Sequence, residues 1–134
     1  MAEPILQQRK SEMVEGQPLK ILIVDDDTSL LEVLQRTFQN AGADVVAHST
    51  FEGARRALHD KSFDALLTDV RLGAFNGLQL AVISRDAHPD IRVIVFSGFD
   101  DPVLRSEAER VGAVYVVKPV KTETLLELVR RPRN

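Results

Sequence analysis

Three consecutive carboxylates, Asp25, Asp26 and Asp27, directly follow the apolar run Ile-Leu-Ile-Val at residues 21–24. Carboxylates so close together raise one another's pKa values or bind a cation. A ligand set made only of oxygens suits Mg²⁺. A carboxylate here can also cap a following helix, and we expect that simpler role for Asp27. The sequence therefore predicts a magnesium site on Asp25 and Asp26.

Single polar residues follow three other apolar runs: Asp69, Ser97 and Lys118. Taken alone, these could be a turn cap, a serine that ends a strand and a surface lysine. Together with the acid pair they suit phosphoryl transfer, in which a carboxylate can be the nucleophile and the moving group spreads charge over three oxygens. The chain has no cysteine, and its three histidines lack metal-ligand spacing. Asp69 is therefore the best candidate nucleophile.

Five apolar strands alternate with five amphipathic helices. The predicted strands span residues 19–24, 43–47, 63–68, 91–96 and 114–117, the predicted helices span residues 28–41, 51–58, 77–85, 102–111 and 122–129, and residues 70–76 form a predicted loop. Such alternation predicts a parallel sheet with helices on both faces. Because ligands of open α/β sheets bind at the carboxyl ends of the strands, the polar residues should converge on one edge.

The composition predicts one globular domain with short tails. The chain has 134 residues and a net charge of −3, with a pI of about 5.6. An acidic chain without a basic patch is a poor candidate for direct nucleic-acid binding. No apolar run reaches the ~18 residues of a membrane span, and no signal peptide is present, so the expected compartment is the cytoplasm. We place a flexible tail at 1–18, the domain at 19–130 and a C-terminal tail at 131–134.

Four motifs in combination resemble the receiver domain of response regulators in two-component signalling: Ile-Val-Asp-Asp-Asp, Leu-Leu-Thr-Asp-Val-Arg-Leu, Val-Phe-Ser-Gly and Tyr-Val-Val-Lys-Pro. The resemblance covers residues 19–129. It implies a flavodoxin-like fold, a doubly wound five-stranded parallel sheet in the order 2-1-3-4-5 with five helices. It further implies a phosphorylation-dependent switch, not an enzyme beyond its own phosphotransfer and dephosphorylation.

The resemblance assigns chemical roles to the matching residues. Asp69 would accept a phosphoryl group from a histidine kinase or histidine phosphotransfer protein. Asp25 and Asp26 would hold Mg²⁺, with Asp26 as the direct ligand, and Asp69 and the backbone carbonyl of Arg71 would add to the ligand set. Lys118 would bind the phosphoryl oxygens, and its peptide bond to the following proline would be cis.

The resemblance also implies how phosphorylation would change the surface that binds a partner. Ser97 would be the switch hydroxyl and Tyr115 the switch aromatic, although Tyr115 alone looks like an ordinary half-buried strand residue. Phosphorylation would draw Ser97 toward Asp69 and let Tyr115 rotate inward. The face built from the fourth helix, fifth strand and fifth helix would then bind a downstream protein or a second copy. Gly73 stands where many members carry proline, which predicts a more mobile loop.

Two other functions fit part of the pattern. One is a small Mg²⁺-dependent phosphohydrolase with an aspartyl nucleophile, because residues 25–27 contain an Asp-x-Asp. Such enzymes need an additional segment to bind substrate, and the ordered chain leaves no room for one. The other is a receiver-like binding module that is no longer phosphorylated, against which the intact acids and Lys118 count.

Overall fold

The computed structural model describes residues 17–131 of the chain. Residues 1–16 and 132–134, which make up most of the two predicted tails, lie outside the described residues. Within residues 17–131, no helix has the length and hydropathy needed to cross a membrane.

A five-stranded parallel sheet forms the centre of the molecule. Its order is β2-β1-β3-β6-β7. The strands are β1 (Lys20–Val24), β2 (Asp44–His48), β3 (Ala65–Asp69), β6 (Arg92–Ser97) and β7 (Val114–Val117). All four neighbouring pairs are parallel. Because β6 and β7 are the fourth and fifth strands of this sheet in chain order, the predicted order 2-1-3-4-5 and the flavodoxin-like fold are confirmed.

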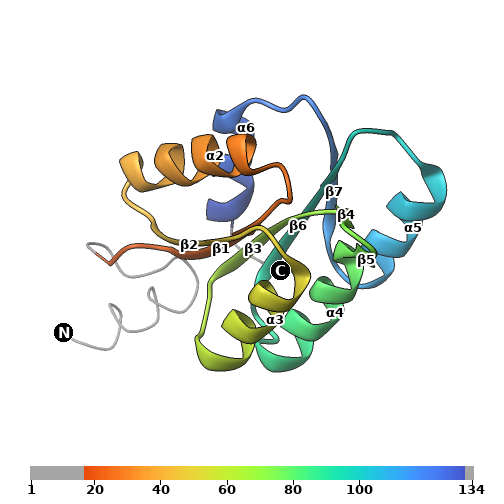
Figure 1. Ribbon diagram of the computed structural model, residues 1–134, viewed down its shortest axis with the longest axis horizontal. Coiled ribbons are helices and arrows are strands. Elements are labelled where there is room, and N and C mark those ends of the chain that lie inside the picture. Colours follow the sequence, from red (N-terminus) through yellow and green to blue (C-terminus); the bar gives the residue numbers. More distant parts are fainter. Residues whose placement is uncertain (1–16, 132–134) are drawn as a thin grey trace.

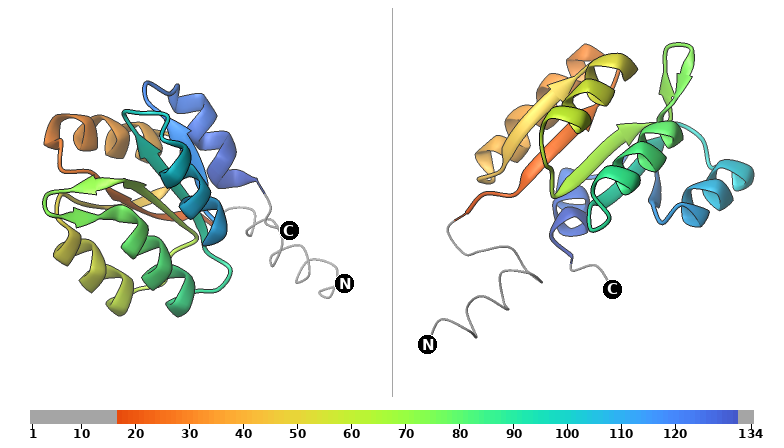
Figure 2. Two further views of the ribbon diagram at one scale, coloured as in Figure 1. Left: turned by 90° about the vertical axis from the view of Figure 1, so that its right-hand side faces the viewer. Right: turned by 90° about the horizontal axis from the view of Figure 1, so that it is seen from below.

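Helices cover both faces of the sheet, as Figure 1 shows. They are α2 (Thr28–Asn40), α3 (Phe51–Asp60), α4 (Gly77–Ala87), α5 (Pro102–Arg110) and α6 (Thr122–Arg130). Helices α3, α4 and α5 contribute to one buried apolar cluster, and α2 and α6 to another. Helices α3 and α4 lie side by side in both views of Figure 2.

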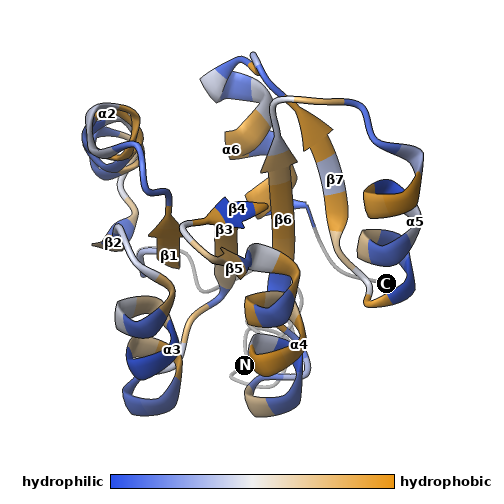
Figure 3. Cartoon of the chain, turned by 45° about the vertical axis from the view of Figure 1, so that its right-hand side comes forward, coloured by the Kyte–Doolittle hydropathy of each residue, from blue (hydrophilic) through white to orange (hydrophobic). Residues whose placement is uncertain are grey.

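The strands separate two cores because their side chains alternate between the faces. In β1, Leu22 and Val24 join the cluster with α3, α4 and α5, which we call the α3–α5 core. Ile21 and Ile23 join the cluster with α2 and α6, the α2–α6 core. All four are 0% exposed. This two-sided burial is why the strands are continuously apolar, a pattern visible for β6 and β7 in Figure 3.

Local signals fix the starts of the helices. The side chains of Asp27, Thr50 and Asp101 accept hydrogen bonds from the first turns of α2, α3 and α5. Helix α4 begins with a capping box between Asn76 and Gln79. Each cap satisfies backbone N–H groups that a helix start leaves without partners. The helices therefore begin directly after the loops at the carboxyl edge of the sheet.

The prediction of an irregular loop at residues 70–76 is wrong. Two short antiparallel strands, β4 (Arg71–Leu72) and β5 (Phe75–Asn76), form a hairpin there, which projects beyond β3 in Figure 2. Gly73 in its turn has φ of 62°, a conformation that favours glycine. The ring of Phe75 stacks on Phe51 of α3 with centroids 4.6 Å apart. The hairpin is thus held against α3.

Candidate functional site

The carboxyl ends of β1 and β3 bring Asp25 and Asp69 together. Asp25 is 0% exposed, and its Oδ1 accepts a hydrogen bond from the backbone N–H of Asp27 at 2.9 Å. Its own backbone N–H donates to the carbonyl of His48 in the neighbouring strand. Asp69 is the last residue of β3, which is paired on both sides. Both carboxylates are therefore fixed by the central strands of the sheet.

Asp26 completes the acid cluster at the surface. It is exposed, and its Oδ2 accepts a hydrogen bond from the backbone N–H of Gly73 at 3.3 Å. Asp27 caps α2 through hydrogen bonds from Ser29 and Leu30, as predicted. Three adjacent aspartates therefore have three environments: one buried, one at the rim of the cluster and one on the helix.

Lys118 supplies the positive charge of the cluster. Its Nζ lies 3.4 Å from Asp25 Oδ2 and 3.5 Å from Asp69 Oδ2. The same ammonium lies 5.1 Å from the centre of the Phe96 ring. The peptide bond to Pro119 is cis, as expected. Lys118 thus reaches from the end of β7 to the buried Asp25 and the partly buried Asp69.

The electrostatics of the cluster act most visibly on Asp69. Its pKa is raised above the usual range, chiefly because burial disfavours the charged form. The Lys118 ammonium opposes this rise, as does a hydrogen bond from the backbone N–H of Arg71. The negative charges of Asp25 and Asp26 add to it. The folded protein therefore holds more negative charge at this edge than the nearby ammonium balances.

The acid cluster fits a hard divalent cation. One carboxylate oxygen from each of Asp25, Asp26 and Asp69 can be chosen so that the three lie within 4.8 Å of one another. Ligands of an octahedral Mg²⁺ at about 2.1 Å from the metal lie about 3–4 Å apart, so small side-chain rotations suffice. Because all the donors are oxygens, the set matches Mg²⁺ or a similar cation.

Two residues that support Asp69 were not predicted from the sequence. Thr68 Oγ1 donates a hydrogen bond to the Asp69 carbonyl at 2.9 Å. Gly77, at the start of α4, packs so close that a Cβ there would lie 2.0 Å from the same carbonyl oxygen. A glycine at the start of a helix gives no sequence signal of such a contact, because the partner is eight residues away across the hairpin.

Ser97 and Tyr115 lie beside the acid cluster rather than in it. Ser97 is 5% exposed and Tyr115 6%. The backbone N–H of Phe99 donates to Ser97 Oγ at 3.2 Å, and the Tyr115 hydroxyl donates to the Phe99 carbonyl at 2.7 Å. The sequence-based expectation that Tyr115 is half-buried is therefore wrong. The side chain is buried and already points inward.

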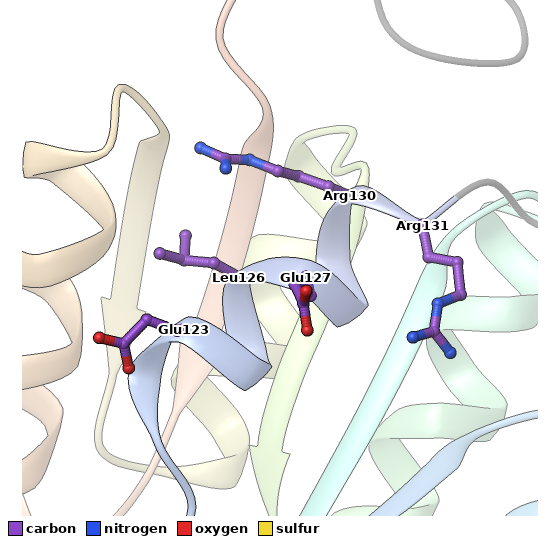
Figure 4. A pocket seen from close by; sticks show the side chains of 5 residues that line it. All are labelled: Glu123, Leu126, Glu127, Arg130 and Arg131. Carbon is purple, nitrogen blue, oxygen red and sulfur yellow. The ribbon is translucent and has the colours of Figure 1, made fainter.

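A separate hollow of about 470 Å³ lies over α6, away from these residues. Figure 4 shows its lining, in which Glu123, Leu126 and Glu127 come from the exposed side of the helix and Arg130 and Arg131 from its end. None of the residues predicted for the chemistry lines it. We assign it no part in the site.

The arrangement of the acids, Lys118 and Ser97 at one sheet edge agrees with a comparison of the sequence with known families. The model of the response regulator receiver domain matches residues 21–130. The chain belongs to the response regulator receiver family. It is therefore a signalling switch of the two-component type, in which phosphorylation is the general means of control.

One relative of this receiver domain shows how much of a longer protein the chain corresponds to. The response regulator protein FleR of Pseudomonas aeruginosa is 34% identical over 113 residues, which are 84% of this chain and 24% of FleR. This chain thus spans about a quarter of that relative.

Solved structures of other receiver domain proteins are similar in fold, and two of them serve as examples. One is a response regulator protein from Burkholderia pseudomallei with a phosphorylated aspartic acid, calcium ion and citrate (TM-score 0.79, 26% identity, 83% of this chain and 66% of that chain). The other is a CheY-like receiver domain protein from Methanospirillum hungatei JF-1 (TM-score 0.79, 27% identity, 83% and 90%).

Proposed function

We propose that Asp69 of this receiver domain, spanning residues 19–130, accepts a phosphoryl group from the phosphohistidine of a histidine kinase or histidine phosphotransfer protein. The observation that carries the proposal is the position of Asp69 at the end of a central strand, where it lies close to Asp25 and Asp26 and its Oδ2 is 3.5 Å from the Lys118 ammonium. The same proposal places the chain in the cytoplasm, where kinases draw on ATP.

In the transfer, an Asp69 carboxylate oxygen attacks the phosphorus atom while the bond from phosphorus to the donor imidazole nitrogen breaks. The imidazole leaves with that electron pair and takes a proton from solvent. Lys118 is placed to pair with a phosphoryl oxygen, because its ammonium already contacts the attacking carboxylate. The backbone amide of Arg71 orients that carboxylate. The incoming negative charge thus meets an ammonium and a preset nucleophile.

Mg²⁺ is the proposed cofactor. Asp26 would bind it directly, with Asp25, Asp69 and the backbone carbonyl of Arg71 as the further ligand groups. When bound, the cation would neutralise charge on the acids and on the transferring group. The similar structure from Burkholderia pseudomallei, which has a phosphorylated aspartic acid and a calcium ion, supports a divalent cation in this chain too.

The proposed output is a change in the face formed by α5, β7 and α6, which would bind a downstream protein or a second copy of the chain. Ser97 would donate its hydroxyl hydrogen to a phosphoryl oxygen on Asp69. Because Phe99 contacts both Ser97 and Tyr115, this pull would stabilise the buried position of Tyr115. The phosphoryl group would thus favour one arrangement of that face.

The test is incubation with Mg²⁺ and acetyl phosphate, followed by intact mass. We expect addition of one phosphoryl group, released by hydroxylamine as acyl phosphates are, and no addition without Mg²⁺ or in Asp69→Asn. The Asp101→Asn variant is the matched control, because it changes an aspartate of the same edge that only caps α5. Phosphate found on Ser97 or on Asp26 by peptide mapping would overturn the assignment.

A further inference from the structure

Arg105 of α5 covers the ring of Tyr115, the aromatic residue of the proposed switch. Its guanidinium carbon lies 4.8 Å from the ring centroid. A guanidinium at this distance is attracted to the negative face of an aromatic ring. Since Tyr115 is 6% exposed, Arg105 lies between the ring and solvent on that side.

The loop before α5 anchors Arg105 at its other side. Its Nε and Nη2 both donate to Asp100 Oδ1, at 3.2 and 2.8 Å. Glu109, one turn further along α5, adds a second negative charge that acts on Arg105. The guanidinium is planar and rigid, so one face can stack while the edge donates hydrogen bonds. Arg105 therefore joins the ring to the loop.

The same loop contacts Tyr115 and Ser97 through the residue beside Asp100. Phe99 accepts a hydrogen bond from the Tyr115 hydroxyl and donates one to Ser97 Oγ. The residues from Ser97 to Asp100 are thus tied to Tyr115 twice, at its hydroxyl by Phe99 and at its face by Arg105. A change in the position of Tyr115 must break or carry along both contacts.

We propose that Arg105 is a positioning residue of the switch, holding Tyr115 in its buried position by covering the ring while bound to Asp100. Arg105 thereby sets the fraction of molecules with Tyr115 buried, whatever the state of Asp69. A second consequence rests on the proposed function. Ser97 accepts from Phe99 through a lone pair, so its hydroxyl hydrogen can donate to a phosphoryl oxygen in this arrangement. A phosphoryl group and Arg105 then favour the same arrangement.

The intrinsic fluorescence of the protein comes from Tyr115, because the chain has one tyrosine and no tryptophan. Tyrosine fluorescence and its quenching by acrylamide therefore measure the exposure of this residue in the full chain. In Arg105→Ala we expect the exposed fraction to rise about two- to fivefold, the range of a partly exposed cation–π contact. Arg105→Lys should restore part of the protection, since an ammonium attracts the ring but lacks the planar fork.

Arg110→Ala is the matched control, because it removes the same charge from the same helix at an exposed position. Thermal unfolding of all variants checks that the fold is intact. Equal quenching in wild type and Arg105→Ala would overturn the proposal, and so would an equal rise in Arg110→Ala.

Titration with beryllofluoride and Mg²⁺ tests the second consequence. By linkage, Arg105→Ala should weaken the apparent affinity for this phosphoryl mimic by the factor by which it lowers the fraction of molecules with Tyr115 buried. Unchanged affinity despite a more exposed Tyr115 would overturn the coupling to Asp69. If wild type binds no beryllofluoride, the proposed function fails, while the quenching experiment still decides the role of Arg105.

Discussion

Two glycines at the two ends of the site have very different surroundings. A Cβ at Gly77 would lie 2.0 Å from the Asp69 carbonyl oxygen and 2.9 Å from Thr68 Oγ1, whereas a Cβ at Gly98 would meet nothing within 4 Å. The backbone of Asp69, the proposed phosphoryl acceptor, is closely packed at Gly77, and the backbone beside Ser97 has room at Gly98; we call these the packed end and the open end of the site. Phosphoryl transfer needs reacting groups in fixed positions. A signal needs a segment with a second position. In the proposed function, β3 would meet the first requirement and the end of β6 the second.

The largest expected effect is a loss of stability from a substitution at the packed end, at Gly77. Gly77→Ala should destabilise the fold by about 3 kcal/mol or more, because the new methyl group overlaps backbone atoms that cannot yield. Gly98→Ala, the matched substitution at the open end, should change stability by no more than about 0.5 kcal/mol. Urea unfolding of both variants gives the two values. Similar losses at the two positions would remove the contrast between the ends.

The next largest loss of stability is expected when the Lys118 ammonium, which contacts Asp25 and Asp69 at the packed end, is removed. Lys118→Met keeps an apolar stem beside Phe96 but leaves Asp25 and Asp69 without the cation at 3.4 and 3.5 Å. We expect a loss of about 2 kcal/mol at pH 7, less than for a fully buried pair because Lys118 is partly exposed. The loss should shrink at low pH as Asp69, whose pKa is raised, becomes protonated.

Denaturant unfolding at several pH values measures the Lys118 effect. Lys121→Met, three residues further along, is the control, because Lys121 is exposed and its side chain does not cap α6. An equal loss in the control, or a loss that does not change with pH, would show that the acid cluster is not the cause.

A smaller effect is the stabilisation by bound Mg²⁺, which should depend on the packed end and not on the open end. With free Mg²⁺ at ten times its dissociation constant, wild type should gain about 1.4 kcal/mol of stability. Asp26→Asn should lose most of this gain, because it removes a charge while keeping an oxygen for the Gly73 amide. Asp27→Asn should keep the gain, since asparagine also caps helices. Ser97→Ala at the open end should keep it too, and thermal unfolding in Mg²⁺ and in EDTA compares all four proteins.

The smallest expected effect comes from relieving repulsion at the packed end. The pKa of Asp69 is raised in the folded state, so this group costs stability as the pH rises through its folded pKa and costs none below its unfolded pKa. Asp69→Asn should therefore be more stable than wild type in metal-free buffer at pH 7, by about 1 kcal/mol. The difference should vanish near pH 3. A pH-independent difference would contradict the electrostatic cause.

The sequence predicts the strand ends well because burial on two faces leaves a continuous apolar run that stops at the edge. Asp25, Asp69, Ser97 and Lys118 all mark such stops, and parallel pairing then brings them to one side of the sheet. Strand boundaries shift by one or two residues: Asp69 and Ser97 are the last residues of β3 and β6 rather than the first residues after them.

The features that the sequence does not predict depend on contacts between distant elements. The hairpin of β4 and β5 is too short to show a strand period, and the stacking of Phe75 on Phe51 joins residues from separate segments. The burial of Tyr115 depends on Phe99 and on Arg105 of α5. Neither contact leaves a local pattern, since a tyrosine in an edge strand is equally compatible with the outward position.

The two cores on opposite faces of the sheet have a consequence for engineering. Tyr115 belongs to the α3–α5 core, whereas Val114 and Val116, its neighbours in β7, pack on the α2–α6 core. Substitutions more than about 7–10 Å apart without shared partners act additively. Repacking around Leu31 and Phe38 of α2, which is no part of the proposed output face, should therefore change thermal stability without changing the position of Tyr115. The sheet separates the two cores, so stability and switching can be engineered independently.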